Sequence, residues 1–161
     1  MPLRHEDQDQ LLQGIAVTVY RNANLSDWVK KCVKRQEAVM RGSIQQLGEV
    51  ANVPKAKGGR MPVVTSTLRD SFQSSLHGAS LGSGPDAATF AAMSAQTGDV
   101  IIMGWGGAAS AYARRVNYGF NGTDSLGRTY NQKGAHFMEY GADQWQNIVR
   151  EQCALARASV K

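Results

Sequence analysis

The sequence predicts an α+β fold, in which a small antiparallel or mixed β-sheet is packed by a long helix near the N-terminus and a second helix at the C-terminus. Two long stretches repeat their apolar residues every three or four positions, which is typical of helices. Short apolar runs bounded by turn residues lie outside these stretches and indicate strands. The 161 residues, 42% of them hydrophobic, suffice for a single domain, 1–161, with its own core.

The first third of the chain contains a predicted strand, a long helix and a connection. Residues 1–14 form a polar leader, and the β-branched run Ile15–Tyr20 follows as a strand. Ser26 is a suitable N-cap for a helix from about Asp27 to Val50. Gly, Pro and Lys then accumulate in the segment 54–62, which we predict to be a flexible loop.

The middle of the chain is predicted to hold a short helix and a β-hairpin. Leu68, Phe72 and Leu76 recur at every fourth position and indicate a short helix capped by Thr65. Gln96-Thr97-Gly98 separates two apolar runs, Ala87–Ala95 and Asp99–Gly104. This pattern predicts two strands joined by a tight turn, and with Ile15–Tyr20 they would form the sheet.

The last third is predicted to be helical around one long loop. Ser110 caps a short helix that Gly119 ends, and the final helix begins after His136. Between them, the segment 120–134 has three glycines and little periodicity, which predicts a second flexible loop. The apolar residues predicted to be mostly core are Trp28, Val33, Met40, Ile44, Leu68, Phe72, Ile101, Phe137, Trp145, Ile148 and Val149.

The positive charge is concentrated in one part of the sequence. The chain has a net charge of +5, and eight basic against three acidic residues lie between Ser26 and Arg60, whereas the remainder is balanced. Such a surface could be a solvated helix face, dock on an acidic protein or face a phosphate backbone. The candidate residues that face a partner or DNA are Lys30, Lys31, Lys34, Arg35, Arg41, Lys55, Lys57 and Arg60.

Two glycine motifs resemble catalytic or cofactor signatures, but their context favours turns. Gly78-Ala79-Ser80-Leu81-Gly82 has the form of a nucleophile elbow, yet a helical segment precedes it instead of a strand. Gly104–Ala109 fits a dinucleotide fingerprint with Asp124 twenty residues on, but no second strand ends near that acid. We therefore assign no catalytic and no cofactor-binding residue.

No metal site is predicted either. His136, Glu139 and Asp143 share a helix face, where acids in the first turns ordinarily complement the helix dipole. The two cysteines, Cys32 and Cys153, lack a C-x-x-C neighbour, and they are too few for a disulfide scaffold. No apolar run is long enough for a membrane span, so no membrane partner is expected.

The order of these elements resembles a known virion family. A strand and a long charged helix precede a Thr-x-x-Leu-Arg-x-Ser element and a strand pair, and a helix opened by His-Phe-Met ends the chain. The matching residues are Thr65–Ser71, Ala111-Tyr112-Ala113, Tyr118-Gly119 and His136-Phe137-Met138. From about Ile15 to Leu155, the chain is similar to the neck and tail-completion proteins of long-tailed bacteriophages. It departs from them at Ser66, at Asn117 and in the long segment 120–134.

The resemblance implies a non-enzymatic structural protein without a cofactor, located in the virion neck after assembly in the host cytoplasm. It implies a homo-oligomeric ring that joins the connector or head-closure protein to the tail-tube or tail-terminator protein, with DNA in the channel as a further contact. Within the segment 120–134, the candidate assembly residues are Phe120, Asn121, Arg128, Tyr130 and Lys133. The alternatives are a tail terminator or head-closure protein, a basic nucleic-acid-binding module and a small hydrolase.

Overall fold

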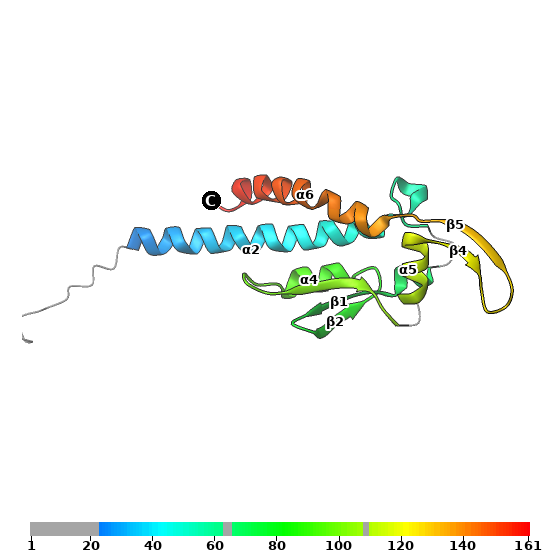
Figure 1. Ribbon diagram of the computed structural model, residues 1–161. Helices are drawn as coiled ribbons and strands as arrows, with labels where there is room; N and C mark the ends of the chain where they lie inside the picture. The colour runs from blue at the N-terminus through cyan, green and yellow to red at the C-terminus, as the bar shows by residue number, and fades with distance from the viewer. Residues whose placement is uncertain (1–22, 63–65, 108–109) are drawn as a thin grey trace, which may run out of the picture. The chain divides into compact units, whose positions relative to one another are not determined.

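Helix α2, Ala23–Asn52, opens the described part of the chain (Figure 1). The computed structural model describes residues 23–62, 66–107 and 110–161. The chain divides into the segment 1–30 and the unit 31–161, which holds every element after α2. The helix predicted from Asp27 to Val50 is confirmed with a longer extent, and it ends just before Pro54, where no amide proton is available to continue it. The predicted strand Ile15–Tyr20 lies outside the described residues.

A three-stranded antiparallel sheet forms the β-structure beside α2. Its strands are β1 (Phe72–Leu76), β2 (Ala79–Ser83) and β3 (Ile101–Trp105), in the order β2-β1-β3. His77 and Gly78 join β1 to β2 with φ angles of 49° and 86°. Positive φ at both central positions is the geometry of a tight hairpin turn that matches the strand twist. The strand predicted at Asp99–Gly104 is confirmed within two residues, but its partner is β1.

The segment Ala87–Ala95 is not a strand, and the predicted hairpin with Asp99–Gly104 is wrong. Residues Ala87–Ser94 form helix α4. Alanine has the highest helix propensity and a low strand propensity, so four buried alanines in eight residues favour the helix. Their small side chains also allow close packing: a Cβ on Gly48 of α2 would collide with the Cβ of Ala88.

The short helix predicted through Phe72 and Leu76 is also wrong beyond its first turn. Helix α3 is only Thr67–Asp70, and Phe72 and Leu76 belong to β1. Apolar residues four positions apart lie on one face of a helix and equally on one face of a strand, so the pattern did not distinguish a helix from a strand. The hydroxyl of Ser71 donates to the carbonyl oxygen of Leu68 at 2.8 Å where the helical turn ends.

The segment 120–134, predicted as a loop, is mostly a β-hairpin. Helix α5, Ser110–Tyr118, is confirmed, and Gly119 follows it with a φ of 83°. Strands β4 (Gly119–Thr123) and β5 (Thr129–Lys133) then pair in antiparallel register. Glycines and asparagines lower the β-propensity of both segments, so the sequence did not predict these strands.

The segment 54–62, predicted to be a flexible loop, has some regular structure. It contains a single 3₁₀ turn, η1 (Lys55–Lys57), and an isolated bridge between Pro54 and Met61. The amide of Lys55 donates to the carbonyl oxygen of Met61 at 2.8 Å, and the amide of Gly59 donates to the carbonyl oxygen of Pro54 at 3.1 Å. Met61 itself is fully buried, so the loop is anchored at its end.

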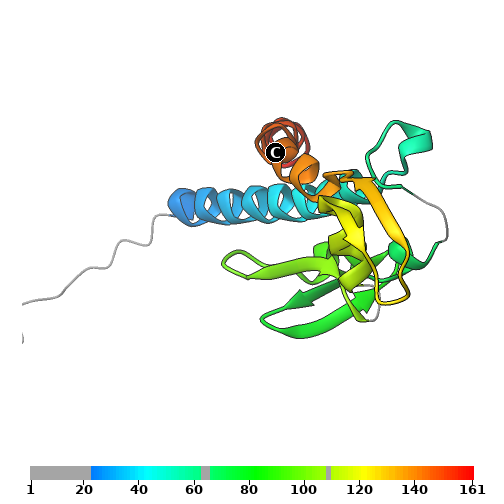
Figure 2. The ribbon, with the colours of Figure 1, turned by 45° about the vertical axis from the view of Figure 1, so that its right-hand side comes forward.

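Helix α6, Phe137–Ser159, confirms the predicted C-terminal helix and runs beside α2 in the opposite direction (Figure 1). Figure 2 shows α6 almost end-on while α2 lies across the view, so the two helices cross at an angle. Near one end of the pair, Arg35 contacts the backbone of Val160. Near the middle, the Gln152 amide donates to the Gln46 side-chain oxygen at 2.7 Å. Within the unit 31–161, α2 therefore packs between α6 and the layer that contains α4 and the sheet.

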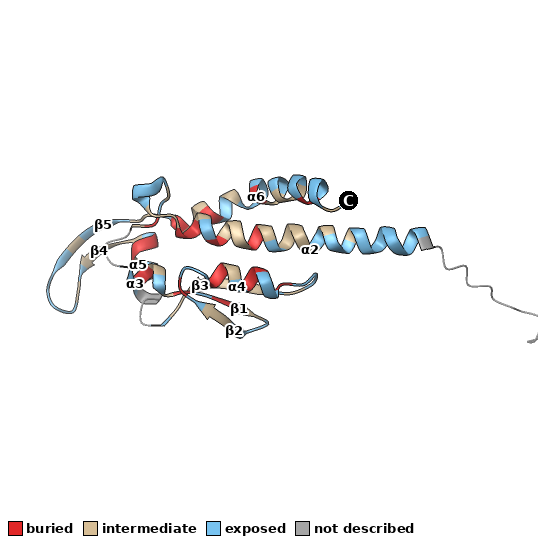
Figure 3. Ribbon diagram, turned by 180° about the vertical axis from the view of Figure 1, so that it is seen from behind, coloured by how far each residue is buried: buried red, intermediate tan, exposed pale blue. Residues whose placement is uncertain are grey.

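Buried residues follow the line where α2, α4, the sheet and α6 meet (Figure 3). The ring of Trp105 links two parts of this core, because its centroid lies 5.1 Å from Phe72 and 4.8 Å from Phe137. Among the predicted core residues, Ile44, Leu68, Phe72, Phe137 and Ile148 are buried, whereas Met40, Ile101 and Val149 are half-buried. The predictions for Trp28, Val33 and Trp145 are wrong, since these side chains are 62%, 42% and 42% exposed.

Candidate functional site

Two of the candidate basic residues on α2 bind helix ends within the fold. The guanidinium of Arg35 donates from Nε and Nη2 to the carbonyl oxygen of Val160 at 3.1 and 2.9 Å, where α6 ends. The Nε of Arg41 donates to the carbonyl oxygen of Ala95 at 3.0 Å, where α4 ends. Cations stabilise helix C-termini through the helix dipole. Arg35 and Arg41 therefore have structural contacts, which helical spacing alone did not reveal.

The remaining basic residues form two separate groups. Lys30, Lys31 and Lys34 are exposed on α2, and Lys30 lies 3.5 Å from the Asp27 carboxylate in an exposed pair of little energetic weight. The second group, Lys55, Lys57 and Arg60, follows the end of the helix. At 1.5 Å per residue, about 27 Å of helix separates Lys34 from Asn52. The positive charge is thus not one continuous footprint.

The second group instead meets the base of the hairpin. Lys55 and Arg60 line one open cleft of about 440 Å³ together with Lys133 of β5. The guanidinium of Arg60 lies over the ring of Tyr140 in α6, 5.1 Å from the ring centroid. Lys57, which is exposed on η1, does not line the cleft. The fold therefore brings together residues from both predicted candidate sets.

The candidate assembly residues lie on the hairpin, where an arginine covers two aromatic rings. Phe120 and Tyr130 pack edge to face with centroids 5.9 Å apart. The guanidinium of Arg115, from α5, lies 3.8 Å from the Phe120 centroid and 5.3 Å from that of Tyr130. Such cation–π contacts stiffen a surface without a hydrophobic core beneath it. Asn121 is exposed on β4 and pairs with Asn131 of β5.

Asp124 organises the apex of this hairpin. Its Oδ1 accepts the amides of Leu126 and Arg128, both at 2.9 Å. Its Oδ2 accepts the Nε of Arg128 at 2.7 Å and the hydroxyl of Tyr130 at 3.2 Å. The hydrogen bond from the Arg128 amide, with help from the other donors, holds the pKa of Asp124 below its ordinary value of 3.8 despite the opposing effect of burial. The apex is therefore a well-defined turn.

This turn presents Leu126 to solvent. Leu126 is 74% exposed, the highest exposure among the large apolar residues of the described chain. The sequence analysis did not identify Leu126 or the role of Asp124. An aspartate followed three residues later by glycine is a turn signal, and it could have revealed both.

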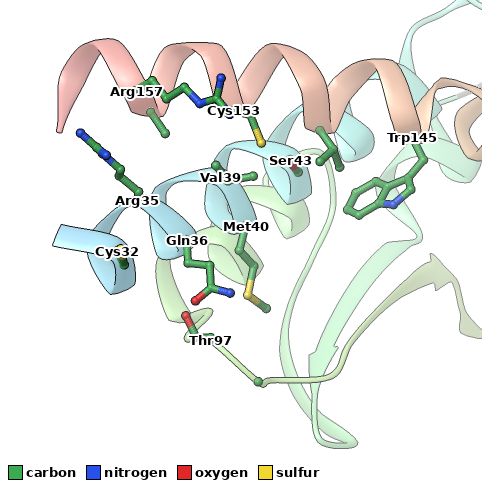
Figure 4. A pocket seen from close by; sticks show the side chains of 13 residues that line it. Cys32, Arg35, Gln36, Val39, Met40, Ser43, Thr97, Trp145, Cys153 and Arg157 are labelled. Carbon is green, nitrogen blue, oxygen red and sulfur yellow. The ribbon is translucent and has the colours of Figure 1, made fainter. Parts of the chain in front are cut away.

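A larger groove runs between α2, α6 and the connection after α4 (Figure 4). Its volume is about 710 Å³, and its walls include Cys32, Val39 and Cys153. Arg35 and Arg157 lie at one end of the groove, and Trp145 lies at the other. Both cysteines are free.

The Ser80 motif and the His136 cluster take structural positions. Ser80 lies inside β2 and pairs with Ser75, so it is not at a turn between a strand and a helix. His136 Nδ1 lies 3.9 Å from a Glu139 oxygen. Although burial raises the pKa of Glu139, hydrogen bonds led by those from the Asn117 amide lower it below its ordinary value of 4.5.

The motif Gly104–Ala109 extends to residues 108–109, which lie outside the described residues. A strand, β4, does end beside Asp124, contrary to the expectation, but it belongs to a different sheet from β3.

Within the ranges that the structure describes, no three His, Cys, Asp or Glu side chains are grouped as a metal site requires. In the same ranges, no helix is both long enough and apolar enough to span a membrane. Comparison of the chain with protein-family models, curated proteins and solved structures finds no match.

Proposed function

We propose that this chain is a structural subunit of the neck of a long-tailed bacteriophage, a tail-completion or head–tail joining protein that assembles as a homo-oligomeric ring between the connector and the tail tube. A tail terminator or head-closure protein is the alternative position within the same neck. In either position the chain acts by contact and catalyses no reaction. The resemblance described above supports the family, and the β4–β5 hairpin supports an assembly role.

The hairpin is the observation that carries this proposal. None of the ten residues in β4 and β5 is buried. A two-stranded hairpin alone is marginally stable in water, and it gains stability when another element covers one of its faces. In this chain Arg115 and the side-chain contacts of Asp124 hold the hairpin in shape. A stiff, uncovered arm with an apolar tip is suited to insertion into a neighbouring subunit.

The outer strands of the three-stranded sheet offer further contact surfaces. Among the described strands, the order β2-β1-β3 places β2 and β3 at the edges of the sheet. Edge strands can pair with another chain through their free amides and carbonyls. At the start of β3, Val100 and Ile102 are 59% and 61% exposed. Exposed apolar side chains of this size on an outer strand favour a protein contact.

Sedimentation velocity of the purified chain, alone and mixed with the connector and tail-tube proteins of the same phage, tests the proposal. We expect a discrete multimer for the wild type and loss of that species for Leu126→Ser. The control is Met93→Ser on α4, an equally drastic change at a side chain that is 72% exposed. It should leave the multimer intact.

Both variants should keep the thermal stability of the wild type, since neither side chain is buried. A wild-type protein that stays monomeric under every condition, or a Leu126→Ser variant that assembles as the wild type does, would contradict the proposal.

A further inference from the structure

The cleft lined by Lys55, Arg60 and Lys133 is built from two segments fixed to the same core. One wall ends at Met61, and the other adjoins Val116 and Ala135. Met61 and Val116 are 0% and 2% exposed and belong to one apolar cluster with Phe137. The positions of the cationic residues therefore depend on core packing.

Backbone hydrogen bonds and glycines hold both walls in place. The amide of Lys55 donates to the Met61 carbonyl oxygen at 2.8 Å, and the amide of Ala135 donates to the Val116 carbonyl oxygen at 3.0 Å. A Cβ at Gly59 would collide with the carbonyl oxygen of Val53, so the loop closes this tightly only with glycine there. Such a cleft requires little ordering when a ligand binds, which favours affinity.

In the described part of the chain, no acidic side chain forms an ion pair with the positive charges of the cleft. No acidic side chain lines it, and none of the ion pairs in the described ranges involves Lys55, Arg60 or Lys133. Glu139, the neighbour of Tyr140 in α6, does not line the cleft, and its carboxylate accepts two hydrogen bonds from Asn117, at 3.0 and 2.8 Å. Three like charges around one cleft repel each other, and an anion between them relieves this repulsion.

We infer that this cleft binds a phosphate group of a nucleic-acid backbone. Arg60 offers the planar fork that matches phosphate oxygens, and its position over Tyr140 orients it. No aromatic residue lines the cleft, and Val116, its largest aliphatic lining residue, is only 2% exposed, so the cleft exposes no large apolar side chain to the anchor residue of a protein partner. Its chemistry therefore favours a phosphate over an acidic peptide. The inference is independent of the neck proposal, because it requires neither a ring nor the apex of the hairpin.

Fluorescence anisotropy with a short labelled DNA duplex tests the inference over a range of salt concentrations. The double variant Arg60→Gln/Lys133→Gln removes two charges from the cleft. The matched control Lys31→Gln/Lys34→Gln removes two charges from the exposed face of α2. All four side chains are exposed, so both variants should fold, which their melting temperatures will confirm.

We expect the cleft variant to lower the slope of log affinity against log salt by about 0.9, the contribution of one phosphate contact. This corresponds to about 15-fold weaker binding at about 50 mM salt and about 4-fold at about 200 mM. The control variant should keep the wild-type slope. Equal losses in the two variants, or a wild type that does not bind the duplex, would overturn the inference.

Two further measurements separate phosphate binding from general attraction to anions. In a nuclear magnetic resonance titration of the wild type with the same duplex, the amides of Gly59 and Gly134 should shift at the lowest DNA concentrations. Polyglutamate at equal charge concentration should displace the duplex poorly. Efficient displacement that requires Arg60 and Lys133 would show that the cleft prefers an acidic protein, and it would contradict the inference.

Discussion

Substitution of Asn117 tests the contact that fastens α5 and the hairpin to the start of α6. The Asn117 side chain is fully buried, and its Oδ1 accepts the amide of Met138 at 3.0 Å. The N-cap residue of α6, His136, makes no side-chain capping bond, so Asn117 caps this helix from another element. Its Nδ2 also donates to both oxygens of Glu139, as described above.

The cost of Asn117→Ala follows from these contacts. Loss of the cap costs about 1 kcal/mol. Loss of the bonds to the carboxylate costs about 1.5 kcal/mol, the low end for a charged acceptor, because the Glu139 side chain is 43% exposed and water can replace the donor. The sum of about 2.5 kcal/mol corresponds to a melting temperature about 5–10 °C lower.

Urea unfolding followed by circular dichroism measures this loss. Asn117→Asp keeps the acceptor for Met138 but places a second carboxylate beside Glu139, so at neutral pH it should cost more than Asn117→Ala. That difference should narrow as the pH falls and one carboxylate is protonated. The control Asn147→Ala, at an exposed position of α6, should change stability by less than about 0.5 kcal/mol. A loss below about 1 kcal/mol in Asn117→Ala would refute this account of the α5–α6 contact.

Two further predictions concern the hairpin apex and the α2–α4 contact. The pKa of Asp124 is lowered below 3.8 in the fold, so the carboxylate stabilises the apex fully above about pH 4, and this stabilisation is lost as the pH falls through the lowered pKa. The chemical shift of the Leu126 amide should therefore titrate in this pH range in the wild type but not in Asp124→Asn. Gly48→Ala should destabilise the protein by about 1–3 kcal/mol in urea unfolding, because the new Cβ collides with Ala88. Gly141→Ala should stabilise it by up to about 1 kcal/mol, because its new Cβ has no neighbour nearer than 3.6 Å. The opposite order of stabilities would contradict the packing described.

The two long helices could be predicted from the sequence because their apolar spacing extends over many turns. A short pattern is less informative. Leu68, Phe72 and Leu76 fit a helix and a strand equally well. Phe72 and Leu76 lie in a strand because β1 forms antiparallel hydrogen bonds with β3, which is distant in the sequence. Spacing shows which residues share a helix face, but it does not show whether another element covers that face. Val33 and Trp145 were therefore predicted as core although both are exposed.

The sequence named candidate residues, but it did not predict how they are arranged. Phe120, Arg128 and Tyr130 were selected as members of a loop, and the structure places them on one hairpin. The cleft could not be predicted, because Lys55 and Lys133 are distant in the sequence and meet only through the packing of Met61 and Val116. Long-range contacts of this kind have no local sequence signal.

Photo-crosslinking from the hairpin apex tests the central claim most directly, namely that the apex contacts a neighbouring subunit. A benzophenone amino acid at position 126 reacts with whatever lies against the apex in an assembly formed with the connector and tail-tube proteins. We predict covalent products with a second copy of this chain or with one of these proteins, and their loss when the assembly is dissociated. Uncrosslinked monomer as the sole product in an intact assembly would contradict the claim.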